Sequence, residues 1–221
     1  MKSLKINLKS PTLGQTTWIK AGVLLAICLP LAKILWQVWQ TTQGQDSGLG
    51  ANPIEYILRA LGEITFYLLC LTLLVTPLRK ITGATWLLKL RRMLGVSTFA
   101  YATLHLLAYA AWDQGLDIGD ILTDTAKRPF IFAGMAAWFL MLPLALTSFN
   151  AAIRFMGGKR WQWLHRAVYA VAIAATLHFW WMKASKNDLL RPASFALVVA
   201  VLLGYRVWAW VSGRRTASVK T

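Results

Sequence analysis

The sequence contains three histidines, and each lies in a strongly apolar stretch with tryptophan or leucine neighbours. They are His105, His165 and His178. An imidazole ring in membrane hydrocarbon is costly unless it is paired or bound to a metal, so a histidine in such a stretch marks a candidate functional site. Neutral imidazole is also a common protein ligand of the iron in b-type haem. The three rings are therefore the first candidates for holding a cofactor.

Two other pairs of polar residues could do chemistry. Arg91 and Arg92 are adjacent at the start of an apolar stretch, and two guanidinium groups there can bind phosphate, carboxylate or lipid headgroups. Glu63 is the one carboxylate deep in an apolar stretch, and Arg59 lies one turn before it. This spacing favours an ion pair within one helix, and a proton or quinone role for Glu63 is the alternative.

The composition is typical of a membrane protein. Hydrophobic residues make up 57% of the 221 residues, charged residues only 14%, and the mean hydropathy is +0.50. A soluble domain of this size does not need so much apolar surface, whereas a bundle of membrane helices does. The formal net charge is +16, but the basic residues flank apolar stretches, which argues for membrane topology and against nucleic-acid binding. No Cys-x-x-Cys-His motif occurs, so covalent c-type haem attachment is excluded.

Apolar runs long enough to cross about 30 Å of hydrocarbon predict six transmembrane helices in a single all-α membrane domain, 1–221. Asn52-Pro53-Ile54-Glu55 is a strong helix start, and Pro77 is expected to end or bend the second helix. The first run is too long for a cleaved signal and contains Lys33, so we expect it to be retained. The approximate spans are 18–40, 54–77, 93–112, 129–149, 163–182 and 193–212.

The distribution of charge predicts the orientation. Sixteen of the 24 Lys and Arg residues lie in the segments 1–20, 79–92, 150–166 and 213–221, which contain no Asp or Glu. The positive-inside rule places these segments, and with them both termini, in the cytoplasm. The loop 183–192 is basic as well, but it does not reverse the total. All connections are short and no nucleotide-binding motif is present, so an electron donor would have to be a separate protein or a membrane-dissolved molecule.

With this topology the third and fifth spans run in the same direction. His105 lies about 18 Å and His178 about 22 Å from the inner ends of their spans at 1.5 Å per residue. Two histidines at similar depth on parallel helices predict a bis-imidazole haem site. His165 lies about 20 Å lower than His178 and is turned about 140° away from it on a straight helix. It therefore either forms an interfacial hydrogen bond or belongs to a second site.

An ordered set of segments resembles the MsrQ family, which belongs to the ferric reductase-like transmembrane proteins. The match extends from about residue 52 to 210, and no single segment would suffice. The segments are Asn-Pro-Ile-Glu-Tyr at 52–56, Leu-Leu-Val-Thr-Pro-Leu-Arg at 73–79, Arg-Arg-Met-Leu-Gly at 91–95, Leu-His-Leu-Leu at 104–107, Lys-Arg-Pro-Phe-Ile at 127–131, Leu-Pro-Leu-Ala-Leu-Thr-Ser at 142–148, Trp-Gln-Trp-Leu-His-Arg at 161–166 and Leu-His-Phe-Trp-Trp at 177–181.

The resemblance implies a b-type cytochrome of the bacterial inner membrane that passes electrons to a periplasmic molybdopterin methionine sulfoxide reductase (MsrP-like) for the repair of oxidised proteins. In such a protein His105 and His178 are expected to bind the haem iron, and His165 is implicated as well. Two-haem relatives carry a histidine at the place of Arg91, so a second haem would lack its usual ligand here. The family is also associated with FMN and quinone, and Arg91 and Arg92 are the candidates for the flavin phosphate.

The implied role is that of an electron-transfer subunit rather than a catalytic subunit, with a cytoplasmic flavin reductase or a quinol as donor. The aspartate-rich loop 113–128 is a candidate docking face for the partner, although a solvated loop would have the same composition. Two other classes remain. A stand-alone transmembrane ferric or quinone reductase would share the haem but need no periplasmic enzyme. A transporter or structural membrane protein would bind no haem.

Overall fold

The computed structural model describes residues 11–184 and 187–218. The basic N-terminal residues Lys2, Lys5 and Lys9, and Lys186 of the 183–192 loop, lie outside this part of the chain. Within it, all regular structure is helical. The elements are α1 (Leu13–Thr42), α2 (Pro53–Thr82), η1 (Thr85–Leu87), α3 (Leu88–Ala108), the π-helix η2 (Tyr109–Asp113), α4 (Ile118–Lys127), α5 (Pro129–Leu146), α6 (Asn150–Met156), α7 (Gly158–Leu164), η3 (His165–Ala167), α8 (Val168–Ala184) and α9 (Leu190–Ser218).

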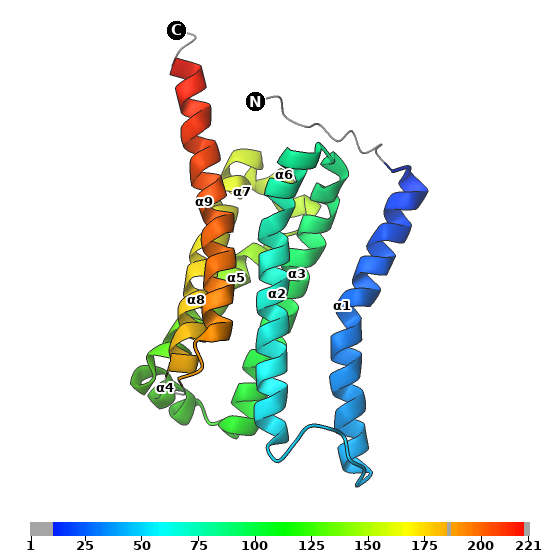
Figure 1. Ribbon diagram of the computed structural model, residues 1–221, viewed down its shortest axis with the longest axis vertical. Coiled ribbons are helices and arrows are strands. Elements are labelled where there is room, and N and C mark those ends of the chain that lie inside the picture. The colour runs from blue at the N-terminus through cyan, green and yellow to red at the C-terminus, as the bar shows by residue number, and fades with distance from the viewer. Residues whose placement is uncertain (1–10, 185–186, 219–221) are drawn as a thin grey trace.

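The long helices run up and down along one axis (Figure 1). Helices α1, α3 and α8 run in one direction, and α2, α5 and α9 run in the other. The short helix α4 lies at one end of the bundle, and α6 and α7 lie at the opposite end. We call these the α4 end and the α6 end. The most extensive packing joins α2 to α3 and α5 to α8, so each of the two histidine-bearing helices has one principal neighbour.

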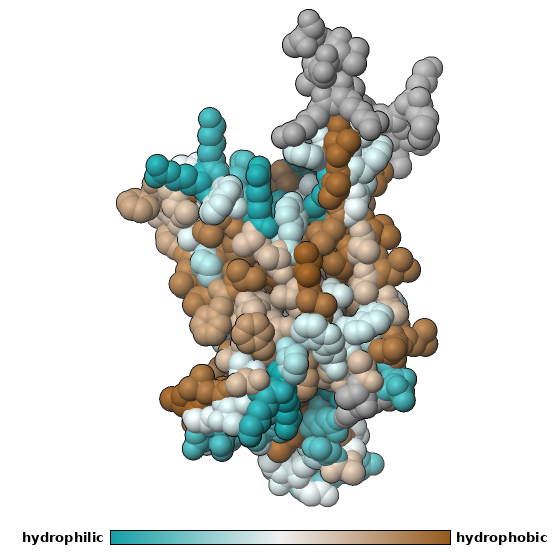
Figure 2. All heavy atoms as spheres, turned by 90° about the vertical axis from the view of Figure 1, so that its left-hand side faces the viewer, coloured by the Kyte–Doolittle hydropathy of each residue, from teal (hydrophilic) through white to brown (hydrophobic). Residues whose placement is uncertain are grey.

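Within the described residues, five helices are long and apolar enough to cross a membrane, and the chain is a multi-pass membrane protein. A band of apolar side chains lies between more hydrophilic ends (Figure 2). The predicted span 163–182 differs from the other predicted spans, because the structure divides it at the 3-10 turn His165–Ala167 and leaves α8 with 17 residues. The five helices are Gly14–Thr42, Pro53–Thr82, Thr85–Asp113, Pro129–Leu146 and Leu190–Ser212.

Local sequence signals explain where α2 and α5 begin. The Asn52 side chain caps α2 by accepting a hydrogen bond from the backbone N–H of Glu55 at 3.1 Å, as predicted, and Pro129 is the first residue of α5. Pro77 does not end α2, which continues to Thr82 and stops at Gly83 in the left-handed conformation (φ 72°). A membrane helix tolerates an internal proline because its neighbours satisfy the freed backbone groups.

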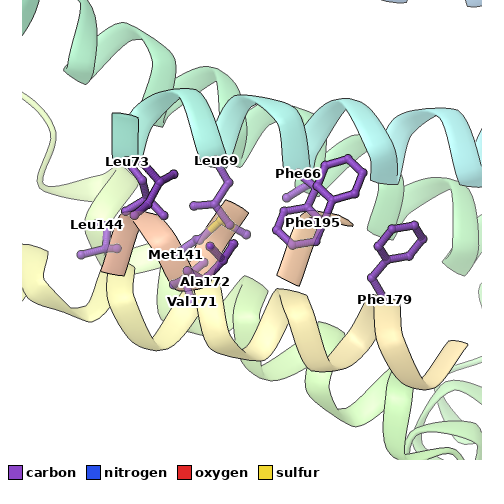
Figure 3. Packing of buried hydrophobic residues seen from close by; sticks show 12 residues of the cluster. Phe66, Leu69, Leu73, Met141, Leu144, Val171, Ala172, Phe179 and Phe195 are labelled. Carbon is purple, nitrogen blue, oxygen red and sulfur yellow. The ribbon is translucent and has the colours of Figure 1, made fainter. Parts of the chain in front are cut away.

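The main core lies between α2, α5, α8 and α9 and consists of leucine, phenylalanine and small residues (Figure 3). Phe66 of α2 stacks on Phe195 of α9 with ring centroids 4.7 Å apart, and Phe179 of α8 meets both rings edge-on. Aromatic pairs at such distances stabilise a core beyond their buried area. This cluster forms the floor of the cavity described next.

Candidate functional site

Two histidine rings face each other in the half of the bundle nearer the α4 end. His105 of α3 and His178 of α8 have ring centroids 6.1 Å apart and ring planes inclined by 78°. Both rings line a cavity of about 810 Å³ between α2, α3, α5 and α8. The structure therefore brings these two residues together from parallel helices, 73 positions apart in the sequence.

Each ring is oriented by a backbone carbonyl of the neighbouring helix. His105 donates its Nδ1–H to the carbonyl oxygen of Leu58 on α2 at 2.9 Å, and His178 donates its Nδ1–H to the carbonyl oxygen of Phe130 on α5 at 2.6 Å. A carbonyl oxygen only accepts, so the Nδ1 atoms carry the protons and the Nε2 atoms keep their lone pairs. This is the usual arrangement around a metal-bound histidine, where the second nitrogen is fixed by an outer hydrogen bond.

A glycine makes room for each ring. A Cβ atom on Gly134 of α5 would lie only 2.8 Å from Nδ1 of His178, and a Cβ on Gly62 of α2 would lie 3.3 Å from Cε1 of His105. Each glycine lies four residues after the residue whose carbonyl accepts the hydrogen bond. Composition and spacing alone gave no reason to select either glycine, but a glycine inside an apolar helix is a signal of close approach.

His165 lies apart from this pair, in the 3-10 turn before α8. Its ring stacks on Trp161 with centroids 3.8 Å apart, and its Nδ1 donates to the carbonyl of Trp161 at 3.0 Å. Its Nε2 is buried without a hydrogen-bond partner among the described residues. A hydrogen bond is thus present, as one prediction required, but the free Nε2 is available to a further ligand.

Arg206 of α9 is an arginine that the sequence interpretation missed. The guanidinium of Arg206 on α9 donates to the carbonyls of Leu73 and Leu202 and lies over the Tyr169 ring, 5.4 Å from its centroid. Arg91 is close enough to act electrostatically on both His165 and Arg206. A charged residue inside an apolar span was the available signal.

Arg91 and Arg92 differ in their surroundings. Arg92 is exposed and donates to Oδ1 of Asn150 on α6 at 2.8 Å, whereas Arg91 is half-buried. Adjacent residues on an α-helix point about 100° apart, which is the reason for the divergence.

The predicted ion pair between Arg59 and Glu63 is wrong. Arg59 pairs with Glu55 on the preceding turn, and Glu63 accepts a hydrogen bond from Arg191 of α9 at 2.7 Å. Contact between α2 and α9, which the sequence could not show, supplies Glu63 with a partner from another helix.

Comparisons with known proteins all indicate the same family. The family model described as "Ferric reductase like transmembrane component" matches residues 61–176, which include His105 but end just before His178. A protein of Ralstonia nicotianae is 52% identical over 79% of this chain and 81% of its own length. Proteins of Herminiimonas arsenicoxydans (47% identical; 90% and 89% covered) and Azospira oryzae (52%; 89% and 82%) are similar. The chain belongs to the MsrQ family. All three relatives are named protein-methionine-sulfoxide reductase heme-binding subunit MsrQ, and no solved structure matches.

The residues of this MsrQ-family chain fit a haem group. An imidazole nitrogen binds a metal at about 2.0–2.1 Å, and the ring centre lies about 1 Å further on, so two imidazoles on one metal ion have ring centres about 6 Å apart. His105 and His178 meet this requirement at 6.1 Å. The cavity of about 810 Å³ falls in the range of about 300–1,000 Å³ that is usual for cofactor sites. Three features therefore fit a haem site: two imidazole ligands, Nδ1 hydrogen bonds that leave Nε2 free, and glycines that make room for the rings.

Proposed function

We propose that this chain is a b-type cytochrome of the bacterial inner membrane that binds haem b between His105 and His178. Its six spans form one membrane domain over residues 1–221, with both termini in the cytoplasm. Its role is to carry electrons to a periplasmic methionine sulfoxide reductase of the molybdopterin type (MsrP-like). It acts as the electron-transfer subunit, and the catalytic subunit is the partner.

The paired, hydrogen-bonded imidazoles carry this proposal. Haem bound there would supply reversible one-electron transfer. The protein's own residues fix the site: the carbonyls of Leu58 and Phe130 hold both Nδ1 protons, which leaves the Nε2 atoms as the ligands that would hold the haem iron. The apolar floor of the cavity excludes water on the α6 side.

The α6 end is the proposed side of electron entry. Arg91, Arg206 and the unpartnered Nε2 of His165 offer positive charge and a hydrogen-bonding nitrogen to a reduced flavin or a quinol. FMN binding through Arg91 and Arg92 remains a proposal, and the divergence of the two side chains favours Arg91 as the inward contact. His165 would be the single imidazole ligand of an iron at this end, because within the described residues no second histidine lies opposite it.

The α4 end is the proposed docking side for the partner. The loop 113–128 is mostly helical, with Asp117 capping α4 by accepting from the N–H of Asp120 at 3.0 Å. Asp124 is engaged inside the protein by Tyr109 and Arg128. The exposed aspartates of the first turn are the ones left to face a basic partner surface.

A reduced-minus-oxidised spectrum with haem quantitation tests the proposal. Wild type is expected to show a low-spin b-type signal, which His105→Ala and His178→Ala abolish. His165→Ala is expected to keep this signal and to slow reduction by the donor. A haem that is lost only in His165→Ala would reveal a second site, and a wild type without haem would overturn the electron-transfer role.

A stand-alone ferric or quinone reductase is the second candidate, favoured by the description of the matching family model. Activity of the purified chain separates the two. The proposed role predicts rapid oxidation of the reduced chain by the periplasmic enzyme and slow oxidation by ferric chelates or quinones. The reverse order would assign the stand-alone function.

A further inference from the structure

We infer that Lys183, Arg59 and Arg128 bind the two carboxylate groups of the haem, so that its acidic edge faces the α4 end. This assignment rests on the proposed haem site between His105 and His178. It gives these three residues a role in anchoring the haem. The sequence predicts no cofactor-binding role for any of them.

The cavity is polar at one end and apolar at the other. Toward the α6 end its walls are Phe66, Leu69, Met141 and Val171, which belong to the core cluster (Figure 3). Toward the α4 end its walls carry the charged groups. Burying an ionised carboxylate among apolar side chains is strongly unfavourable unless a cation pairs with it. The acidic edge of a bound haem is therefore excluded from the α6 end.

Three cations line the polar end of the cavity. Each lies close in sequence either to one of the two histidines or to a residue whose carbonyl binds one of them. Arg59 directly follows Leu58, Arg128 lies two residues before Phe130, and Lys183 lies five residues after His178 on α8. The same short segments thus set the imidazoles and the positive charges. A group bound by both histidines would have these cations along one edge.

Lys183 is the strongest of the three. Its residue is only 8% exposed, whereas a lysine is almost never fully buried unless paired. Its present partner is Asp188, whose side chain is 47% exposed and can turn to water. An ammonium group has three donors, so Lys183 can donate a hydrogen bond to a haem carboxylate with or without releasing Asp188.

The two arginines also have donors to spare. Arg59 pairs with Glu55 and Arg128 with Asp124, both at the i,i+4 spacing on the helix ends. A guanidinium group has five N–H donors, and one carboxylate uses at most two in a bidentate pair.

Carboxylates line the same end of the cavity: Glu55, Glu63 and Asp113. Glu55 and Glu63 each face a guanidinium of their own, Arg59 and Arg191. Since these acids repel a haem carboxylate, binding depends on the cations, and removing one cation should have a measurable effect.

The test compares haem b with its dimethyl ester, in which both carboxylates are neutral, on the full-length apoprotein in detergent. For wild type, esterification is expected to weaken binding at least tenfold. For Lys183→Gln, and for Arg59→Gln combined with Arg128→Gln, the same modification should weaken binding by a clearly smaller factor than in wild type, because fewer cations remain to distinguish acid from ester. An equal loss in wild type and variants would overturn the assignment.

Lys127→Gln is the matched control, since it removes one positive charge beside Arg128 on an exposed residue that does not line the cavity. It should keep the wild-type discrimination. Lys183→Arg should keep it too, which separates charge from packing if Lys183→Gln folds poorly. Failure of the proposed function looks different: wild type would then bind neither haem nor its ester with a bis-imidazole spectrum.

Discussion

Replacing Gly134 by alanine should displace His178, one of the two proposed haem ligands, while leaving the fold intact. The added Cβ would lie 2.8 Å from Nδ1 and 3.0 Å from Cε1 of His178, whereas ordinary contact begins at 3.4 Å. The imidazole must therefore retreat by about 0.6 Å, which a close-packed interior resists. An imidazole ring is rigid, so the whole ring must move to relieve the contact. Its Nδ1 is also held by the hydrogen bond to the carbonyl of Phe130 at 2.6 Å.

The magnitude follows from the outer hydrogen bond. Loss of such a partner typically lowers metal affinity by about 10–100-fold, which is roughly 1.4–2.7 kcal/mol. The change from glycine to alanine itself favours a helix by about 1 kcal/mol, so the helix content of the apoprotein should not fall. We expect Gly134→Ala to bind haem about 10–100-fold more weakly and to show part of the haem in a high-spin form.

Haem titration of the apoprotein, with absorption spectra of the ferric and ferrous forms, measures the effect. Gly62→Ala is the matched control on the other histidine, because its Cβ would be 3.3 Å from His105, a shift of only about 0.1 Å. Gly204→Ala, with nothing within 4 Å, is the control for the glycine-to-alanine change alone. If Gly134→Ala binds haem as tightly as these two controls, the proposed packing of His178 against α5 is wrong.

Three further predictions concern other parts of the bundle. Tyr101→Phe removes the hydrogen bond from the Tyr101 hydroxyl to the carbonyl of Ile27 (2.5 Å), which joins α3 to α1. Thermal unfolding in detergent should show that the free energy of unfolding falls by about 1 kcal/mol, while the haem spectrum stays unchanged. The hydrogen bond from Lys183 holds the pKa of Asp188 below its usual range, so its stabilisation is present above about pH 4 and is lost as the pH falls further. Asp188→Asn should therefore lower Tm at pH 7, and wild type should converge with it in more acidic buffer. Arg206→Met should slow reduction of the haem by reduced flavin about tenfold, the equivalent of one charge-assisted hydrogen bond, without changing haem content; an unchanged rate would remove Arg206 from the entry site.

The helical membrane architecture could be predicted from the sequence because hydrophobic length and helix-start signals are local properties. Asn52 and Pro129 mark the starts of α2 and α5 as predicted. The break at His165–Ala167 could not be predicted, because the segment 163–182 has the composition of a continuous span. The break is accompanied by a tertiary contact, the hydrogen bond from Nε1 of Trp161 to the carbonyl of Thr147 at 2.9 Å, which the sequence does not reveal.

The facing of His105 and His178 was also accessible from sequence, since depth follows from the rise per residue and direction follows from the number of preceding spans. Which residues of different helices contact each other could not be predicted from the sequence. Periodicity places Glu63 and Arg59 on one face of a helix, but Glu63 pairs with Arg191, which is 128 positions away. The same limit hid Arg206, whose role depends on the packing of α9 against α2 and α8.

The two histidine sites share one local arrangement, and backbone geometry explains it. In an α-helix the carbonyl of residue i points toward residue i+4, whose side chain normally shields it from a lateral donor. Glycine at i+4 leaves that carbonyl open. Leu58 with Gly62, and Phe130 with Gly134, follow this rule, and in each case an imidazole of the adjacent helix fills the opening. A histidine in an apolar span can therefore gain an outer hydrogen bond without any polar side chain on its neighbour. Here the two proposed ligands need no buried acid beside them, because two glycines and two carbonyls orient the rings.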